Sequence, residues 1–491
     1  MSDIIVNAFN EVHVRIDCNR GIAMEMSDHF SFYVPGYKFM PKYRNGMFDG
    51  KIRLFNTKTF TIYKGLLHYI KDFAKSRDYS IKIDESLEDA TEFSAFECGK
   101  FVQALKPKYE PRDYQIKGVI DCIRNNRALI LSPTGSGKSL MIYLLSRFYP
   151  MKKLIIVPTI SLVLQMASDF EDYSNNKFTD ILKITGETDK AWKNGIKENV
   201  VISTWQSIAK MPKSFFDQFG VVIGDEAHGY KAASLTGIME KLTNCKYKFG
   251  FTGTLDGAEA HQLILEGLFG KVYRTTTTKE LMDKKELAEL NIKLLILKYS
   301  DNTKKLLNKA KYPDEMDFII SNEKRNNFIK NLTFSLNGNT LVLFQYVDKH
   351  GKILYDLFQK EKTNRPIFFV FGGTKGHQRD AIRKIVEEEE NAIIIASVGT
   401  FSTGVNIKRL HNIIFTSPSK AKIKNLQSIG RGLRLGQNKD TCTLFDIADD
   451  LQYKKHINYT LRHMTERIKY YSQEQFNYKI YKIKIEENDN E

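Results

Sequence analysis

A glycine-rich loop between an apolar strand and a helix constrains the fold more than any other segment. Residues 132–139 read Ser-Pro-Thr-Gly-Ser-Gly-Lys-Ser, between the apolar run 128–131 and the helical pattern 140–148. The backbone N–H groups of such a loop and the start of the helix bind phosphate oxygens. We expect Lys138 to reach the β- and γ-phosphates of ATP and the Ser139 hydroxyl to bind Mg²⁺. The other residues of this nucleotide site are Pro133, Thr134, Gly135, Ser136 and Gly137.

An acidic element follows a later strand. Asp225-Glu226-Ala227-His228 comes directly after the apolar run 221–223, about ninety residues beyond the loop. In a nucleotide hydrolase, Asp225 is placed to hold Mg²⁺, and Glu226 to orient and deprotonate the attacking water. Four residues match easily by chance, but their place at the end of a strand does not. The loop and the acidic element together predict an NTPase.

Short apolar runs alternate with helical patterns in two successive blocks. The first block contains the runs 128–131, 154–157, 200–202 and 221–223, and the second contains 340–344, 367–370, 392–396 and 412–415. Near-continuous apolar strands separated by helices are typical of a parallel sheet that is covered on both faces. The fold class is therefore α/β, with two such domains in tandem.

We predict four regions along the chain. They are a small α+β nucleic-acid-binding domain (1–105), a first, ATP-binding α/β domain (106–280), a second α/β domain (281–451) and a short, basic helical tail (452–491). In the first region, the alternating stretches 12–16 and 51–55 predict strands, and the apolar periodicity of 65–75 predicts a helix.

Composition narrows the class of protein. The 491 residues include 74 Lys and Arg against 58 Asp and Glu, a net charge of +16 that favours a polyanionic partner. Five scattered cysteines without a C-x-x-C pair argue against a disulfide framework and a zinc site. The chain begins without a signal-peptide pattern, and no apolar run reaches the roughly 18 residues of a membrane span. We expect a cytoplasmic protein that does not bind a membrane.

The nucleotide elements and the segments around them resemble the motor of superfamily 2 helicases. Ser132 stands where the strict phosphate-loop pattern has Gly, a substitution that is usual in this family. Arg112 and Gln115 match the family's adenine-reading motif. Further matches in the first α/β domain are 158–165, 203–206 and 252–254. The resemblance implies a nucleic-acid contact for Thr159, and it implies that His228, Thr252 and Thr254 couple hydrolysis to the nucleic acid.

The second α/β domain carries the other motifs of that family. They are residues 343–346, 400–406 and 427–434. The resemblance implies that Thr403 contacts nucleic acid, that Gly404 belongs to the nucleotide site and that Gln427 takes part in coupling. Asn406 departs from the family, which often has Asp there. Both α/β domains are then expected to be RecA-like.

Two arginines in the last of these motifs have a physical role of their own. Arg431 and Arg434 are three residues apart and therefore share one face of a helix. They can act as arginine fingers on a γ-phosphate held by the first domain, an effect typically worth about 10³ to 10⁵ in rate. Hydrolysis would then require the two domains to close on the nucleotide, so that ATP turnover produces movement.

The first region is rich in cations and aromatic residues. Between Phe32 and Lys64, seven basic residues accompany one acid, Asp49, a local net charge of 7 − 1 = +6. Cations suit phosphates and aromatic rings suit bases. We expect nucleic-acid contacts from five of the cations, which are Lys38, Lys42, Arg44, Lys51 and Arg53. The aromatic residues are better explained as the core of this small domain.

Residues 36–54 (GYKFMPKYRNGMFDGKIRL) and 474–478 (EQFNY) are similar to the UvsW-type helicases of T-even phages. Members of that family unwind branched DNA, migrate Holliday junctions, regress stalled forks and remove R-loops. The resemblance implies an ATP- and Mg²⁺-dependent DNA helicase for recombination-dependent repair and replication. It also implies single- and double-stranded DNA and RNA–DNA hybrids as partners, a monomer, recombination or single-strand-binding protein partners, and the host cytoplasm. Asp-Glu-Ala-His in place of the expected Asp-Glu-Cys-His indicates a more distant member.

Three alternatives and one open question accompany this interpretation. An RNA helicase or remodeller would share the motor. A restriction-enzyme motor subunit would need a nuclease centre, but Glu323-Lys324 follows Pro313-Asp314 where Glu-x-Lys is required. An inactive ATPase that only binds or anneals DNA is disfavoured because the catalytic residues are all present. The tail has eight cations and two acids over 452–484, which either hold a duplex arm or form a solvated helix face.

Overall fold

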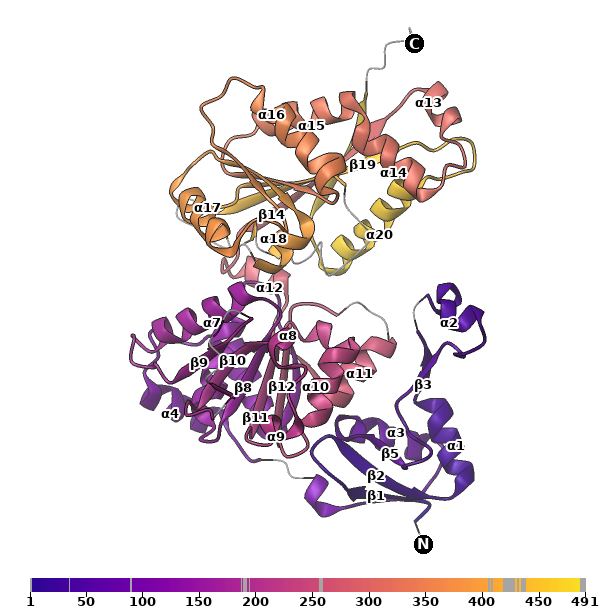
Figure 1. Ribbon diagram of the computed structural model, residues 1–491, viewed down its shortest axis with the longest axis vertical. Helices are drawn as coiled ribbons and strands as arrows, with labels where there is room; N and C mark the ends of the chain where they lie inside the picture. The colour runs from indigo at the N-terminus through magenta and orange to yellow at the C-terminus, as the bar shows by residue number, and fades with distance from the viewer. Residues whose placement is uncertain are drawn as a thin grey trace. The chain divides into compact units, whose positions relative to one another are not determined.

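The computed structural model describes residues 2–34, 36–88, 91–186, 188, 192–193, 195–255, 259–404, 407, 409–417, 429–430, 432–433 and 439–485. The chain divides into two compact units (Figure 1). The first unit is Met1–Ser132 with Gly137–Thr276, and the second is Thr277–Glu491 with the loop Pro133–Ser136.

The first unit begins with a small α+β domain, here called the front domain (residues 2–88). Its elements are β1 (Ile4–Ala8), β2 (His13–Cys18), α1 (Arg20–His29), β3 (Ser31–Tyr33), η1 (Tyr37–Phe39), α2 (Pro41–Arg44), β4 (Lys51–Arg53), β5 (Thr61–Tyr63), η2 (Lys64–Leu66), α3 (Leu67–Ser76), β6 (Ile81–Ile83) and η3 (Glu85–Leu87). Four strands form a sheet in the order β5-β2-β1-β6, and β3 pairs with β4 in a separate antiparallel ribbon. Alternation along β2 buries Val14 and Ile16, as the sequence predicts.

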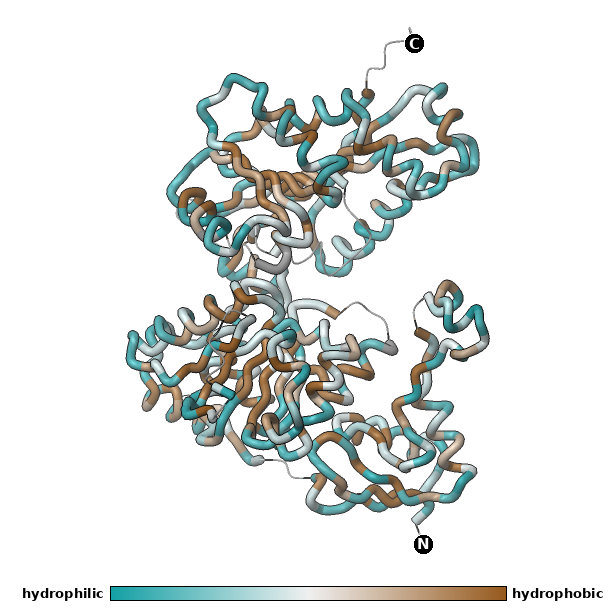
Figure 2. The backbone as a smooth tube through the Cα atoms, in the orientation of Figure 1, coloured by the Kyte–Doolittle hydropathy of each residue, from teal (hydrophilic) through white to brown (hydrophobic). Residues whose placement is uncertain are grey.

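The rest of the first unit is built on a parallel sheet and is here called the first motor domain, after the function that the sequence predicts. Its strands are β7 (Arg127–Leu131), β8 (Lys153–Val157), β9 (Ile181–Ile184), β10 (Val200–Thr204), β11 (Val221–Asp225), β12 (Tyr247–Thr252) and β13 (Val272–Arg274), in the order β13-β7-β12-β11-β8-β10-β9. These neighbouring strands pair in parallel. Every residue of β7, β8 and β10 is buried, and Figure 2 shows these strands as the apolar centre of the domain. This confirms the first predicted RecA-like sheet.

Helices cover this sheet. They are α4 (Ala95–Leu105), α5 (Asp113–Asn125), α6 (Lys138–Phe148), α7 (Ile160–Tyr173), α8 (Trp205–Ile208), α9 (Lys213–Phe216), α10 (Ala233–Lys241) and α11 (Glu259–Phe269). Helix α4 begins with a capping box between Ser94 and Glu97. Helix α4 contacts α5, and its Cys98 belongs to the core of the motor domain. Phe93, just before the helix, belongs to the same core. Residues 93–105 therefore pack on the motor domain, although the sequence predicts a domain boundary at 105.

The front domain and the first motor domain share one hydrophobic core. Apolar residues of β1, β2, α1 and α3 belong to the same cluster as those of β8, β10, α10 and α11. Glu11 accepts a hydrogen bond from Lys64 Nζ at 2.8 Å and pairs with the buried Arg127 at 3.0 Å, and the Tyr63 hydroxyl donates to Glu240 at 2.8 Å. At Gly65, the backbone of η2 lies directly on α11. The front domain is thus built into the first unit.

The second unit contains the other predicted RecA-like sheet. Its strands are β14 (Glu289–Lys298), β15 (Thr340–Phe344), β16 (Ile367–Val370), β17 (Ile393–Ser397), β18 (Asn412–Phe415), β19 (Thr441–Asp450) and β20 (Tyr478–Lys484), in the order β16-β17-β15-β18-β19-β14-β20. Its helices are α12 (Thr278–Asp283), α13 (Asp301–Leu306), α14 (Tyr312–Ser321), α15 (Glu323–Ser335), η6 (Val347–Gly351), α16 (Lys352–Gln359), α17 (Gly376–Glu388), α18 (Val398–Gly404) and α20 (Tyr459–Gln473). The neighbouring strands of this sheet also pair in parallel.

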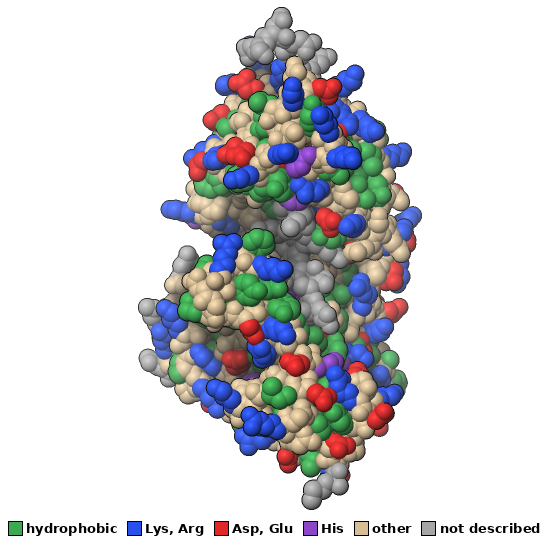
Figure 3. All heavy atoms as spheres, turned by 90° about the vertical axis from the view of Figure 1, so that its right-hand side faces the viewer, with side chains coloured by type: hydrophobic (Ala, Val, Ile, Leu, Met, Phe, Trp, Pro, Cys, Tyr) green, Lys and Arg blue, Asp and Glu red, His purple; other side chains and the backbone are tan. Residues whose placement is uncertain are grey.

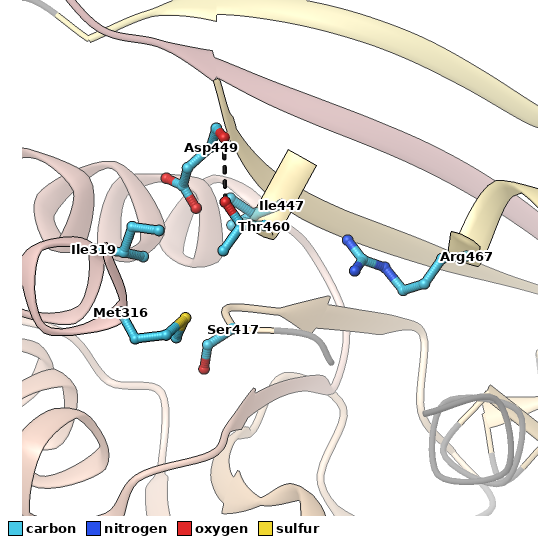
Figure 4. Close-up of a pocket in the computed structure, with 7 residues that line it drawn as sticks. All are labelled: Met316, Ile319, Ser417, Ile447, Asp449, Thr460 and Arg467. Atoms are coloured by element: carbon cyan, nitrogen blue, oxygen red, sulfur yellow. Dashed lines mark hydrogen bonds between the residues drawn. The ribbon is translucent and has the colours of Figure 1, made fainter. Parts of the chain in front are cut away.

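The tail contains the predicted helix, α20, and also a strand. Strand β20 adds to the edge of the sheet beside β14, with Tyr478 opposite Ile292. Arg467 of α20 is buried, and it donates to both oxygens of Asp446 at 2.8 and 2.9 Å. Arg467 also lines a small pocket with Asp449 and Thr460 (Figure 4). The tail is part of the second domain, and Arg467 is not available to hold a duplex.

Candidate functional site

The phosphate loop connects β7 to α6 and is shaped by its glycines. Gly135 and Gly137 have φ values of 88° and 76°, a left-handed conformation that side chains with a Cβ rarely adopt. The Ser136 hydroxyl donates to the Pro133 carbonyl at 2.7 Å, and Lys138 Nζ donates to the Ser132 carbonyl at 3.3 Å. Lys138 is the first residue of α6, so the amino end of that helix faces the loop. This geometry is suited to a polyphosphate.

The start of α5 is bonded to this loop. Gln115 Oε1 accepts from the backbone N–H of Arg112 at 2.9 Å, and its Nε2 donates to the Gly137 carbonyl at 3.4 Å. A Cβ at Gly137 would lie 2.4 Å from Gln115 Nε2, so glycine permits the approach. Arg112 Nη1 donates to the Tyr114 hydroxyl at 3.0 Å. The structure brings Arg112 and Gln115 to the nucleotide site, and their contact with adenine stays a prediction.

The acidic element ends β11 beside the loop. Burial and the neighbouring Glu226 carboxylate raise the pKa of Asp225 to about 6, although the charge of Lys138 acts in the opposite direction. Glu226 has a left-handed backbone, with φ of 50°, and its N–H donates to Asp225 Oδ1 at 2.9 Å. Two carboxylates are therefore adjacent at the end of the strand.

The donor atoms here fit a divalent cation with oxygen ligands. A positive ion would favour the charged form of Asp225, whose pKa is raised by burial and by Glu226. The described residues contain no group of three or more His, Cys, Asp or Glu side chains that could hold a metal. Mg²⁺ keeps several waters and binds through one or two protein oxygens and the phosphates of its substrate, and the Ser139 hydroxyl and the Asp225 carboxylate would be those protein oxygens.

A histidine connects the acidic element to the neighbouring strand. His228 Nδ1 lies 3.1 Å from the Thr252 hydroxyl at the end of β12 and 3.4 Å from Glu226 Oε2. The Thr252 hydroxyl in turn donates to the Thr254 carbonyl at 3.0 Å. The structure therefore brings together His228, Thr252 and Thr254, the three coupling residues predicted for the first domain.

Two contacts at the loop were not predicted from the sequence. The Ser139 hydroxyl lies 2.7 Å from the hydroxyl of Tyr173, the last residue of α7. The Thr275 hydroxyl donates to the Ser132 hydroxyl at 2.9 Å. Neither Tyr173 nor Thr275 belongs to a local motif, and only the tertiary fold brings them to the loop.

The remaining predicted site residues have different outcomes. Gln427, Arg431 and Arg434 lie outside the described residues, so their roles stay predictions. Thr403 and Gly404 are at the end of α18, where the structure describes the backbone but not their side chains. Thr159 is the N-cap of α7, and its hydroxyl accepts from the Leu162 N–H at 3.4 Å. Its nucleic-acid contact is likewise untested.

The predicted cations of the front domain gather on one projection, here called the arm (residues 31–53). The arm comprises β3, η1, α2 and β4, and α2 lies at its tip (Figure 1). Lys38, Lys42 and Arg44 are exposed there, and Figure 3 shows basic and hydrophobic side chains mixed on this part of the surface. Arg53 instead forms an ion pair with Asp49. The aromatic residues of this region differ in burial, because Phe55 is in the core whereas Tyr33 is exposed.

The fold and the site define a class of protein. Two parallel sheets, with a phosphate loop and an Asp-Glu-Ala-His element on the first, form a RecA-like motor of superfamily 2. Solved structures agree on the fold. A Saccharomyces cerevisiae Dbp5 structure bound to RNA and ADP BeF3 has a TM-score of 0.55 at 13% identity, covering 79% of this chain and 93% of that one. A family model for the res subunit of type III restriction enzymes matches residues 108–257, and one for the conserved helicase C-terminal domain matches 323–436.

The chain belongs to the UvsW family of helicases. The ATP-dependent DNA helicase uvsW of Enterobacteria phage T4 is 35% identical over 97% of this chain and 98% of its own length. A model of the N-terminal domain of DNA helicase UvsW matches residues 3–84. The crystal structure of T4 UvsW has a TM-score of 0.52 at 33% identity, covering 99% of this chain and 100% of that one. None of the helices in the described part of the chain is long and apolar enough to span a membrane.

Proposed function

We propose that this chain is an ATP-dependent DNA helicase that translocates on branched DNA and unwinds or branch-migrates it. Holliday junctions, stalled forks and R-loops are its substrates, in recombination-dependent repair and replication. The observation that carries the proposal is the combination of a formed nucleotide site and an exposed basic arm. The nucleotide site provides the motor, and the arm provides a surface for phosphates.

Each residue of the nucleotide site has a distinct part in this proposal. Lys138 binds the β- and γ-phosphates, while Ser139 and Asp225 hold Mg²⁺. When bound, the metal neutralises charge that develops on the phosphate oxygens. Glu226 orients the attacking water and takes up its proton. Arg431 and Arg434 complete the site as arginine fingers of the second domain.

The test compares ATP hydrolysis and strand displacement on four substrates. They are a four-way junction, a forked duplex, an R-loop and single-stranded RNA. We expect branched DNA to stimulate hydrolysis and to be unwound, and Lys138→Ala to abolish turnover while DNA binding persists. Stimulation mainly by RNA would replace the proposal with an RNA remodeller, and no hydrolysis with any nucleic acid would overturn the enzyme assignment.

The arm is tested separately through its salt dependence. Replacing Lys38, Lys42 and Arg44 by Ala should weaken junction binding and reduce the slope of log K against log salt by about one unit for each lost phosphate contact. An unchanged slope would mean that these cations do not contact the DNA backbone.

A further inference from the structure

The tip of the arm is held rigid by its own aromatic residues. The rings of Tyr33 and Tyr37 stack with centroids 4.5 Å apart, and Tyr37 packs edge-on against Tyr43 at 4.8 Å. Gly50 closes the ribbon in a left-handed conformation, and a Cβ there would lie 2.4 Å from the Tyr37 ring. The Met47 N–H donates to the Lys42 carbonyl at 2.9 Å, which folds the chain back after α2. The tip therefore has a defined shape.

Two large apolar side chains are left out of this packing. Phe39 is 77% exposed and Met47 is 74% exposed. Phe39 lies two residues before α2 and Met47 three residues after it, so both belong to the same short tip. A single exposed apolar residue needs no explanation, but two on one projection indicate a contact surface.

The charges around these side chains identify the kind of partner. Lys38, Lys42 and Arg44 are exposed around the tip, and no carboxylate pairs with them among the residues that the structure describes. The only acid of the arm, Asp49, is occupied by Arg53 and by the N–H of Lys51. Cations around an aromatic ring and a thioether match phosphates that flank unstacked bases. Bases are unstacked where a duplex opens.

We propose that Phe39 and Met47 enter the branch point of a DNA substrate and stack on the bases exposed there. Lys38, Lys42 and Arg44 hold the neighbouring phosphates. Insertion of apolar side chains between base steps is an established way for proteins to unstack a duplex. The proposal rests on the proposed helicase function and adds the two side chains that separate the strands.

The base of the arm is anchored in the core of the first unit. Phe30 before β3 and Phe55 after β4 are both buried in the core that the front domain shares with the first motor domain. The Leu54 N–H donates to the Phe30 carbonyl at 2.9 Å, so the chain is clamped where the arm begins and ends. Strand β3 also contacts α11 of the motor domain. A displacement of this motor domain would therefore carry the arm with it.

The experiment uses the full chain and the double substitution Phe39→Ala with Met47→Ala. The matched control is Phe96→Ala with Leu306→Ala, because Phe96 is 70% exposed and Leu306 is 82% exposed and neither lies on the arm. All four side chains are exposed, so both variants should keep the wild-type unfolding midpoint. One readout is strand displacement of a forked duplex. The other is the fluorescence of 2-aminopurine at the branch nucleotide, measured during binding without ATP.

We expect the arm variant to lose fork unwinding by about ten-fold or more, the size of effect that stacking of one base supports. Its hydrolysis stimulated by single-stranded DNA and its salt slope should remain at the wild-type level, because the motor and the cations are intact. Wild-type protein should change the 2-aminopurine signal at the branch, and the arm variant should not. A variant with Phe39→Trp in place of Phe39→Ala retains a ring for stacking, so it should show the 2-aminopurine signal that the Ala variant lacks.

Three outcomes separate this proposal from the helicase function. The role of Phe39 and Met47 is overturned if the wild-type chain unwinds forks without a branch-point signal. It is also overturned if the arm variant unwinds forks at the wild-type rate. Neither result contradicts the helicase function. In the latter case the tip is a protein-docking surface. A branch-point signal that depends on Phe39, in a chain that does not hydrolyse ATP, supports the insertion and overturns the motor.

Discussion

Replacing Gly65 by Ala should force the front domain away from the first motor domain. A Cβ at Gly65 would lie 2.1 Å from the Glu266 carbonyl oxygen and 2.6 Å from that of Gly267. Both are backbone atoms of α11, so neither can rotate away. Real Cβ contacts are essentially never shorter than 3.0 Å, so the two surfaces have to part by at least 3.0 − 2.1 = 0.9 Å. Such overpacking typically costs 1–3 kcal/mol, and opening the interface also weakens the pairing of Glu11 with the buried Arg127. We expect Gly65→Ala to lower the free energy of unfolding by about 2–3 kcal/mol.

The assay follows urea unfolding by tryptophan fluorescence. The two tryptophans of the chain, Trp192 and Trp205, both lie in the first unit and pack against the core that the interface shares. Gly99→Ala is the control, because a Cβ at Gly99 meets nothing within 4 Å and Ala favours the interior of helix α4. The control should be as stable as the wild type or slightly more so. If Gly65→Ala unfolds at the wild-type midpoint, the close approach of η2 and α11 is not a constraint and the reasoning is refuted.

Three further predictions concern other parts of the molecule. Tyr173→Phe removes the hydroxyl that lies 2.7 Å from the Ser139 hydroxyl, and it should raise the Mg²⁺ concentration for half-maximal hydrolysis by roughly five-fold. Nucleotide binding in EDTA should be unchanged. An unchanged Mg²⁺ titration would contradict this prediction. Arg467→Met leaves Asp446 charged and buried, so the free energy of unfolding of the second domain should fall by about 3–5 kcal/mol in chemical unfolding. An unaltered unfolding midpoint would exclude a stabilising ion pair. Burial and the charge of a neighbouring arginine lower the pKa of His350 to about 3. Below about pH 6.5 the unfolded chain therefore takes up a proton that the folded chain does not, and stability falls by up to about 5 kcal/mol as the pH approaches 3. His350→Gln should remove that part of the pH slope between 6.5 and 4, and an identical slope would show that another group is responsible.

Local patterns predicted the parts of the fold whose residues are buried on all sides. The runs that became β7, β8, β10 and β15 are apolar at nearly every position because both faces of a parallel sheet are covered. Strand β20 gave no such signal. It lies at the sheet edge, its residues are mostly exposed, and its partner β14 precedes it by almost two hundred residues.

The candidate site also has parts that local patterns predict and parts that only the tertiary fold brings together. The phosphate loop and Asp225-Glu226 are contiguous motifs, so their meeting at the carboxyl ends of β7 and β11 could be predicted from the order of the strands. Tyr173 reaches Ser139 only through the docking of α7, and no spacing in the sequence specifies that contact. Arg467 has the composition of a surface cation, yet its burial depends on Asp446, twenty-one residues earlier on a different element.

The ion pair between Glu11 and Arg127 also governs how the chain can be divided for biochemical work. Arg127 is the first residue of β7, and β7 leads directly into the phosphate loop. A fragment that starts at residue 106 would include all of the ATPase motifs of the first domain. It would nevertheless leave Arg127 buried without its carboxylate and expose the apolar faces of α10 and α11 to water. We therefore expect such a fragment to aggregate, and soluble ATPase fragments of this chain to require the front domain from its first strand onward.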